Sequence, residues 1–153
     1  MSEINVTIIT TCSSRKLHDK VDRLDLGAVQ SGDMRAVVNE WHHAVSLSSA
    51  DRFPACEVYR GRAFSEARRA AEIVDGELWI VSAGLGLLRS DERIPVYDLS
   101  VTGGGENDVR KKIPGVFIEG EWWSNINRKF QRGENPITKM VTRESAQLYV
   151  FAL

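Results

Sequence analysis

The sequence predicts a single α/β domain over residues 1–153, with a mostly parallel sheet flanked by helices. Two continuous apolar runs of strand length, residues 6–11 and 78–82, are typical of strands that helices cover on both faces. Between these runs, apolar residues recur at helical spacing. A chain of this size buries roughly two thirds of its unfolded surface, so one core is enough.

The first half of the chain shows a strand followed by two helices. Residues 6–11 are β-branched almost throughout and run into a polar loop at 12–16, whereas residues 17–30 are expected to be mostly loop. A helix is predicted over 34–45, because Asp33 offers N-cap chemistry before an apolar stripe. Residues 52–55 indicate a turn, and a second helix is predicted over 64–74 with Gly76 capping its end.

The second half is expected to be less regular. After the strand at 78–82, the chain is predicted to pass over the surface through residues 91–98. Residues 102–107 contain three consecutive glycines and are predicted to be the most flexible stretch. A helix ending at Phe130 and a final strand at 147–153 complete the fold. That apolar last strand either docks at the centre of the sheet or meets a partner, which includes the option of a homo-oligomer.

Composition narrows the classes of partner and compartment. The chain has 20 basic and 21 acidic residues and a net charge of −1, so no global field draws it to nucleic acid or to an anionic membrane. Its longest apolar runs are too short to span a bilayer, and its N-terminus does not resemble a secretion signal. Cys12 and Cys56 are the only cysteines and lack a CxxC pairing, which favours free thiols and a cytoplasmic location.

Two loops are candidate binding elements, because ligands of open α/β sheets bind outside the carboxyl ends of the strands. The loop at 12–16 supplies Ser13 and Lys16, a hydroxyl and a cation suited to an anionic ligand, although a polar surface turn is an equal alternative. The loop after Ser82 holds Gly84 and Gly86, which permit close backbone approach to a ligand. Neither the dinucleotide fingerprint nor a P-loop is present.

Cys12 and Asp91 are the candidate catalytic residues. Cys12 adjoins Arg15 and Lys16, which can lower a thiol pKa and make it a nucleophile, although a cysteine at a strand end is more often a small buried residue. Asp91, like Asp98, follows the glycine loop and can act as a general base or a ribose acceptor. Loop capping, or pairing with a neighbouring arginine, is the structural alternative for these carboxylates. No Cys/His/Asp cluster has metal-ligand spacing, so neither a metal nor a cofactor is expected.

Three blocks of the sequence form a larger pattern. They read Thr11-Cys12-Ser13-Ser14-Arg15-Lys16, then Tyr59-x-Gly61-x-x-Phe64-x-x-Ala67-x-x-x-Ala71, then Trp79-Ile80-Val81-Ser82-Ala83-x-x-Gly86-Leu87-Leu88-x-x-Asp91-x-x-Ile94-x-x-Tyr97-Asp98. This pattern resembles an uncharacterised bacterial and phage α/β domain family, distantly similar to the peroxide-stress protein YaaA and to the Cys-Ser-containing domain of archaeosine synthase. The resemblance covers about residues 5–100. This chain departs from the family at Leu17, where a second lysine is usual, and at Gly84-Leu85, where a Lys-Tyr pair is common.

The resemblance implies a Rossmann-like, glycosylase-like fold and a role in nucleotide, nucleobase or nucleic-acid metabolism, often near DNA modification or defence. The residues that it carries over, all at loop or helix starts, are Cys12, Ser13, Lys16, Tyr59, Gly61, Ser82, Gly86, Asp91 and Tyr97. Residues from such distant parts of the chain are expected to converge on one pocket.

Three functional hypotheses follow. The leading one is an enzyme acting on an N-glycosidic bond or on a related nucleotide or nucleoside, with Asp91 as the carboxylate and with Ser13, Lys16 and Ser82 holding phosphate or sugar. The second is a non-catalytic module that binds a nucleotide or nucleic acid. The third is a protein-interaction domain that uses its C-terminal strand.

Overall fold

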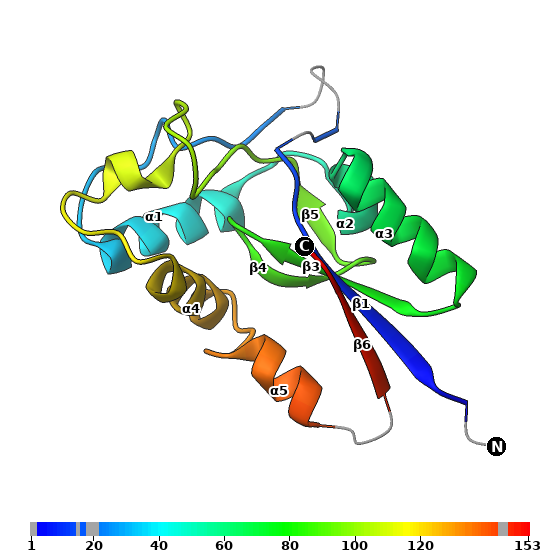
Figure 1. Ribbon diagram of the computed structural model, residues 1–153. Helices are drawn as coiled ribbons and strands as arrows, with labels where there is room; N and C mark the ends of the chain where they lie inside the picture. The colour runs from blue at the N-terminus through cyan, green and yellow to red at the C-terminus, as the bar shows by residue number, and fades with distance from the viewer. Residues whose placement is uncertain (1–2, 15, 18–21, 144–146) are drawn as a thin grey trace.

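The protein, seen here in a computed structural model, is described at residues 3–14, 16–17, 22–143 and 147–153 (Figure 1). These residues form a mixed α/β fold with five α-helices, a four-stranded sheet and a two-stranded sheet. Arg15 and residues 18–21, which belong to the predicted first loop and the stretch after it, lie outside the described residues.

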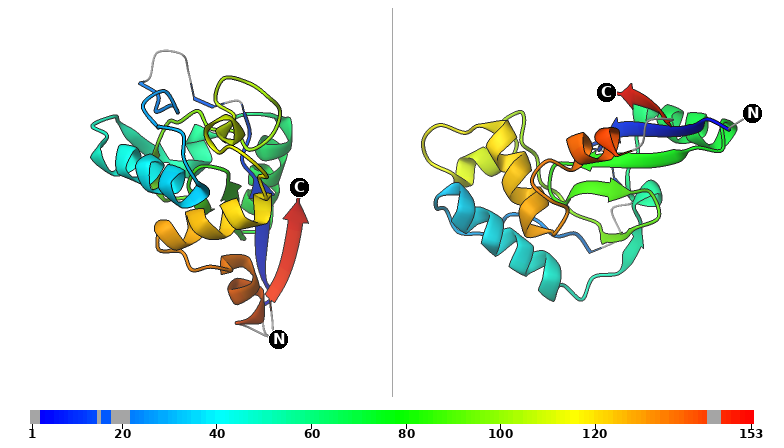
Figure 2. Two further views of the ribbon diagram at one scale, coloured as in Figure 1. Left: turned by 90° about the vertical axis from the view of Figure 1, so that its left-hand side faces the viewer. Right: turned by 90° about the horizontal axis from the view of Figure 1, so that it is seen from below.

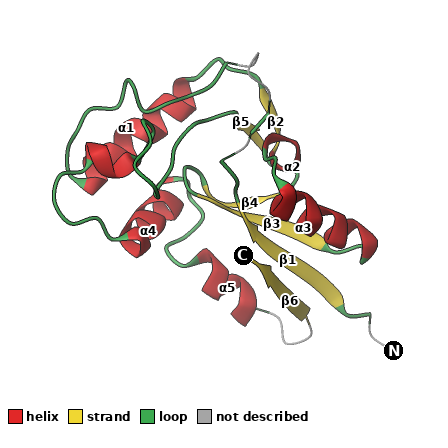
Figure 3. Ribbon diagram, turned by 45° about the horizontal axis from the view of Figure 1, so that its top comes forward, coloured by secondary structure: helices red, strands yellow, loops and turns green. Residues whose placement is uncertain are grey.

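The four-stranded sheet is mostly parallel and has the order β4-β3-β1-β6 (Figure 3). Its central strands are β1 (Asn5–Thr11) and β3 (Glu77–Ser82), which run parallel. Strand β6 (Gln147–Ala152) pairs with β1 in parallel, and β4 (Gly86–Arg89) pairs with β3 antiparallel. The predicted strands at 6–11, 78–82 and 147–153 are thereby confirmed to within one residue at each end.

Helices lie on both sides of this sheet (Figures 1 and 2). Helix α3 (Arg62–Ile73) packs against β1 and β3, while α4 (Glu119–Lys129) and α5 (Pro136–Thr142) lie on the other side. Helix α1 (Met34–Leu47) contacts α4 and begins as predicted, with the Asp33 carboxylate accepting from the Ala36 N–H at 2.8 Å. The main core includes Trp41, Phe64 and Trp122, each at most 2% exposed.

Two predictions for residues 52–98 are wrong. Residues 52–54 are a short strand, β2 (Arg52–Pro54), which pairs antiparallel with β5 (Arg93–Pro95), and helix α2 (Ala55–Val58) follows it. Residues 94–97 do not pass over the surface, because Ile94, Val96 and Tyr97 are at most 2% exposed. The physical reason is that β4 folds back on β3 and directs this apolar segment into the core.

The end of α3 uses Asp75 as well as Gly76. Asp75 has a φ of 49°, the left-handed conformation that the prediction placed at Gly76. The Gly76 N–H still donates to the Ala71 carbonyl at 2.9 Å. Glycine is required here for a steric reason, since a Cβ at residue 76 would lie 2.6 Å from the Val6 carbonyl oxygen.

The glycine-rich stretch at 102–107 is closed at its base by Asp108. Its buried carboxylate accepts from the N–H groups of Gly104 and Arg110, and the Arg110 guanidinium pairs with it at 2.7 Å. The hydrogen bonds with the Arg110 side chain lower the pKa of Asp108 to about 2, outweighing the effect of burial. An added Cβ at Gly103, Gly104 or Gly105 would meet no atom of the described chain within 4 Å beyond its neighbours in the sequence, so there is open space for a side chain at each position.

Strand β6 lies at an edge of the sheet, so the alternative of a central last strand is wrong. Its outer edge has no neighbouring strand among the described residues. Leu148, Val150 and Phe151 are 52%, 40% and 49% exposed, respectively. No helix within the described ranges is both long and apolar enough to cross a membrane.

Candidate functional site

The carboxyl ends of β1 and β3 lie side by side and bring Cys12 next to the loop after Ser82. The Cys12 N–H donates to the Val81 carbonyl at 2.9 Å, and the Ala83 N–H donates to the Cys12 sulfur at 3.4 Å. The thiol is half-buried and unbridged. Cys12 therefore fits both interpretations given for it. It is held by the loop, as a small packing residue would be, and it is partly open to solvent, as a nucleophile must be.

Three buried hydroxyls meet beneath Cys12, from Tyr59, Ser82 and Tyr97. Tyr59 Oη donates to Ser82 Oγ at 3.0 Å, Ser82 Oγ lies 2.6 Å from Tyr97 Oη, and the two tyrosine oxygens are 2.9 Å apart. All three residues are at most 2% exposed. Burial raises the pKa of both tyrosines well above the usual value, so both phenols stay neutral.

The three hydroxyls of this ring can satisfy one another's hydrogen-bonding requirements. If Ser82 donates to Tyr97 and Tyr97 to Tyr59, every hydroxyl donates one bond and accepts one. Ser82 Oγ accepts a further bond from the Leu85 N–H at 3.1 Å. The predicted residues Tyr59, Ser82 and Tyr97 are thus brought together, but as a buried support beneath the site and not as groups that face a ligand.

Lys16 lies directly on this support. Its Nζ is 4.7 Å from the centroid of the Tyr97 ring, and its backbone forms an isolated bridge with Tyr59. Desolvation lowers the pKa of the Lys16 amine, while negative charge at Cys12 and Asp98 acts in the opposite sense. Lys16 therefore releases its proton more readily than an exposed lysine and has a carboxylate, Asp98, in its electrostatic environment.

Ser13 and Gly61 connect the first loop to the start of α3. The Ser13 hydroxyl donates to the Arg60 carbonyl, and Gly61 begins the helix with a φ of 123°. A Cβ at Gly61 would lie 3.5 Å from Ser13 Cβ, so the requirement for glycine is conformational rather than steric. Ser13 is three residues before Lys16, and Gly61 is two residues after Tyr59, which forms a bridge with Lys16. The contact between Ser13 and Arg60 therefore ties the loop that carries Lys16 to the start of α3.

The glycine loop is filled by protein side chains, contrary to the expectation that a ligand approaches it. A Cβ at Gly84 would lie 2.8 Å from Tyr97 Cε2, and one at Gly86 would lie 2.5 Å from Asn127 Oδ1. The carbonyls of the loop are also occupied. Those of Ala83, Gly84 and Leu85 accept from Trp122 Nε1, Trp41 Nε1 and Arg132 Nε at 2.8, 2.7 and 2.7 Å, respectively.

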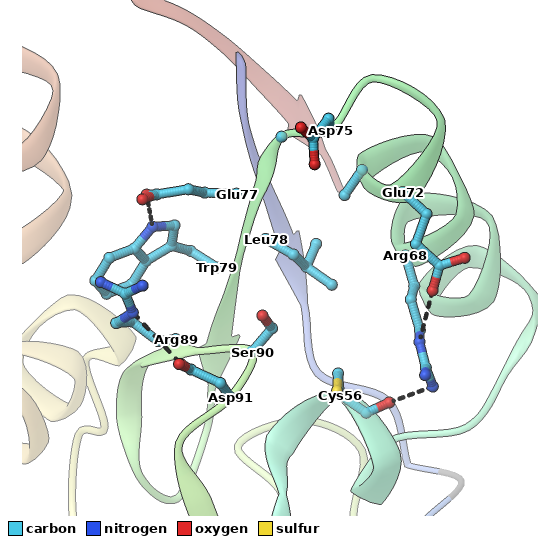
Figure 4. A pocket seen from close by; sticks show the side chains of 12 residues that line it. Cys56, Arg68, Glu72, Asp75, Glu77, Leu78, Trp79, Arg89, Ser90 and Asp91 are labelled. Carbon is cyan, nitrogen blue, oxygen red and sulfur yellow. Dashed lines mark hydrogen bonds and ion pairs between the residues drawn. The ribbon is translucent and has the colours of Figure 1, made fainter. Parts of the chain in front are cut away.

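Asp91 does not join this cluster. The neighbouring Ser90 N–H donates to the Leu78 carbonyl at 3.0 Å, which places Asp91 at the amino end of β3. Ser82 lies at the other end, about 13 Å away at the usual rise per residue of a strand. Asp91 is exposed and pairs with Arg89 at 3.4 Å, the structural alternative named for it (Figure 4). The expectation of one pocket that includes Asp91 is wrong, because β4 runs antiparallel to β3 and returns the chain to the amino end of β3.

The cleft around Asp91 has a volume of about 400 Å³ and an acidic lining (Figure 4). Four carboxylates, from Glu72, Asp75, Glu77 and Asp91, line it with two arginines. Cys56 also lines it, and burial raises the pKa of its thiol, which disfavours the nucleophilic thiolate.

Sequence reasoning missed the contribution of the C-terminal third. Asn127 and Arg132 fix the glycine loop from α4 and the loop after it, and Arg132 is itself held by a bidentate pair with Glu92 at 2.9 and 2.7 Å. No motif spacing links these residues, so the sequence carries no signal for the contact. Among the described residues, no group of three side chains could ligate a metal. No family model, curated protein or solved structure matches the chain.

Proposed function

We propose that this protein is an enzyme of nucleotide or nucleoside chemistry whose site lies at the carboxyl ends of β1 and β3, on a Rossmann-like, glycosylase-like sheet. The observation that carries the proposal is the position of Lys16. Its amine lies on the Tyr97 ring with a lowered pKa, and both Cys12 and Asp98 are close enough to influence that pKa. Perturbed ionisable groups at a strand end are typical of binding and catalytic sites.

In this proposal, Asp98 and not Asp91 supplies the carboxylate that acts as general base. For an N-glycosidic substrate, Asp98 takes a proton from water, whose oxygen bonds to the anomeric carbon as the carbon–nitrogen bond breaks. The Lys16 ammonium gives a proton to the departing base, or contacts a phosphate when the substrate carries one. Cys12 lines the same site. The free thiols of Cys12 and Cys56 fit a reducing, cytoplasmic location.

A ligand screen followed by a product assay tests this proposal. Thermal shifts are measured against nucleobases, nucleosides and nucleotides, and hits are incubated and analysed for released base by mass spectrometry. We expect Lys16→Met and Asp98→Asn to abolish product, whereas Asp91→Asn and Lys129→Met, both at exposed positions, leave it unchanged. Binding that depends on Lys16 but yields no product would replace the enzyme by a non-catalytic binding module. Silence across the panel would reject both.

A second function, self-association through β6, is favoured by its exposed edge. The outer edge of the strand has no neighbouring strand in the described ranges, and three of its apolar side chains are exposed. Gln147–Ala152 contains no charged residue that would repel a second copy. Antiparallel pairing of β6 with itself about a two-fold axis would join two sheets. Light scattering after size exclusion tests this. We expect Val150→Lys to convert a dimer to a monomer, and Val116→Lys, at an 88% exposed loop residue, to leave it intact. A monomeric parent protein at high concentration would refute it.

A further inference from the structure

A second cavity, of about 610 Å³, lies on the side of the sheet that carries α5. Its floor is built from β3, β4 and β6, with Trp79, Arg89 and Tyr149 among the lining residues. Lys139, Met140 and Arg143, at the end of α5 and just beyond it, form one wall. None of these residues belongs to the site around Lys16.

The lining of this α5 groove is cationic, although the whole chain is slightly acidic. Four basic residues, Arg89, Arg132, Lys139 and Arg143, face two carboxylates, Glu77 and Glu92. The lining therefore carries a formal charge of +2, against −1 for the chain. The adjacent cleft of Figure 4, which shares Glu77, Trp79 and Arg89, carries four carboxylates and two arginines, so the two hollows attract ligands of opposite charge.

The cations that remain available in the groove are on the α5 side. Arg132 is neutralised by its bidentate pair with Glu92, and Arg89 is shared with Asp91. Glu77 keeps its negative charge on the β3 side, where its Oε2 accepts a hydrogen bond from Trp79 Nε1 at 3.0 Å. Lys139 and Arg143, four residues apart, line the groove together, and neither has an ion-pair partner within the described part of the chain. They form a pair of cations on one wall.

Aromatic and planar side chains line the same groove as this pair. The Trp79 indole is half-buried, and the Arg89 guanidinium carbon lies 5.5 Å from its ring centroid. The Tyr149 ring is fixed by its hydroxyl, which donates to the Met140 carbonyl at 2.9 Å. Trp79 and Tyr149 face the same side of the sheet, because Thr7 pairs with both Glu77 and Tyr149, and residues two apart share a face.

We propose that the α5 groove binds single-stranded nucleic acid, with Lys139 and Arg143 on the phosphates and the Trp79–Arg89 stack contacting a base. Cations that follow a backbone, placed beside aromatic side chains on which bases can stack, are the chemistry by which single strands are bound without sequence preference. A duplex hides the faces of its bases, and a mononucleotide offers one base and one phosphate group where a single strand offers a series of both. This inference is independent of the function proposed for Lys16.

Fluorescence anisotropy with a labelled oligothymidine of twelve nucleotides, titrated with the full chain at low salt, tests the proposal. The groove variant is Lys139→Glu with Arg143→Glu. The control variant, Arg69→Glu with Lys111→Glu, makes the same change of charge at exposed positions away from the groove. We expect at least a roughly tenfold weakening for the groove variant and less than threefold for the control, because phosphate contacts dominate affinity. The Lys16→Met variant should bind as the parent does.

Three results would overturn the proposal. The first is equal weakening by the groove and control variants, which would mean that binding depends only on the net charge of the protein. The second is equal affinity for duplex DNA or for thymidine monophosphate. The third is an absence of saturable binding by the parent protein. Trp79→Leu tests stacking separately and should weaken binding roughly tenfold, with Trp79→Phe restoring most of it. Circular dichroism of each variant verifies that it is folded.

Discussion

Gly84 lies against the ring of Tyr97, and a side chain at residue 84 would meet that ring at 2.8 Å. Trp41, whose indole N–H donates to the Gly84 carbonyl, bounds the same space at 3.4 Å. The glycine thus fits a packed corner of the core, in which the tyrosine that supports Lys16 is clamped between the loop and the first helix.

The first prediction concerns this corner. Gly84→Ala should destabilise the protein by about 1–3 kcal/mol, the usual cost of adding an atom to a filled core. Gly105→Ala is the matched control, because a Cβ there meets nothing within 4 Å and its φ is not positive, so its effect should stay within about 0.5 kcal/mol. Urea unfolding of both variants measures the difference. Equal stabilities would show that the loop yields to the added methyl group.

The second prediction concerns the hydroxyl ring. Tyr97→Phe removes one member and leaves buried oxygens of Ser82 and Tyr59 short of a partner, which should cost about 1–3 kcal/mol. Tyr59→Phe should act similarly, and the double variant should cost less than the sum, because both single changes open the same ring. Thermal or urea unfolding of the four proteins completes the cycle. Additive costs would mean that the ring does not behave as a unit.

The third prediction is a pH dependence at Asp108. Its pKa is about 2 in the folded protein, below the ordinary 3.8, so its stabilising effect is present above pH 3.8 and is lost as pH falls toward 2. Asp108→Asn should therefore cost about 1–2 kcal/mol at pH 7, and the cost should shrink between pH 4 and pH 2. Unfolding by urea at pH 7, 4 and 2 measures this. Asp91→Asn, at an exposed ion pair, serves as the control.

The fourth prediction concerns the pH dependence of stability at Lys16. The folded protein lowers its pKa below 10.5, so the unfolded chain binds the proton more tightly and the stability of the parent rises with pH between the two values. Lys16→Met lacks this titration. Its stability relative to the parent should be highest at neutral pH and should decline as pH approaches 10.5. A difference that is constant with pH would contradict the burial of the amine.

The regular elements could be predicted from the sequence because their signals are local. Strands β1 and β3 are continuous apolar runs, and α1 shows both an N-cap and an apolar stripe. Strand β4 gives no such signal, because Gly86–Arg89 is short and its antiparallel turn depends on Asn127 and Arg132 from the far end of the chain. Because this turn was not predicted, Asp91 was expected beside Ser82 and not at the amino end of β3.

The candidate site could be predicted only in part for the same reason. Cys12 directly follows β1 and Ser82 is the last residue of β3, so the general rule for adjacent parallel strands places them together. Tyr59 and Tyr97 were included through resemblance alone, and their burial beneath the site depends on packing that no spacing encodes. The α5 groove combines β3, β4 and β6 with α5, contacts that become evident only once the sheet order is known.

The closed ring of Tyr59, Ser82 and Tyr97 has a consequence for spectroscopy. Its three hydroxyl protons are sealed from water, so their exchange with solvent requires the core around them to open. Such protons give separate resonances where those of exposed hydroxyls are averaged with the solvent. The chemical shifts of these protons can therefore report on binding, because a molecule that contacts Lys16 would perturb the Tyr97 ring on which Lys16 lies.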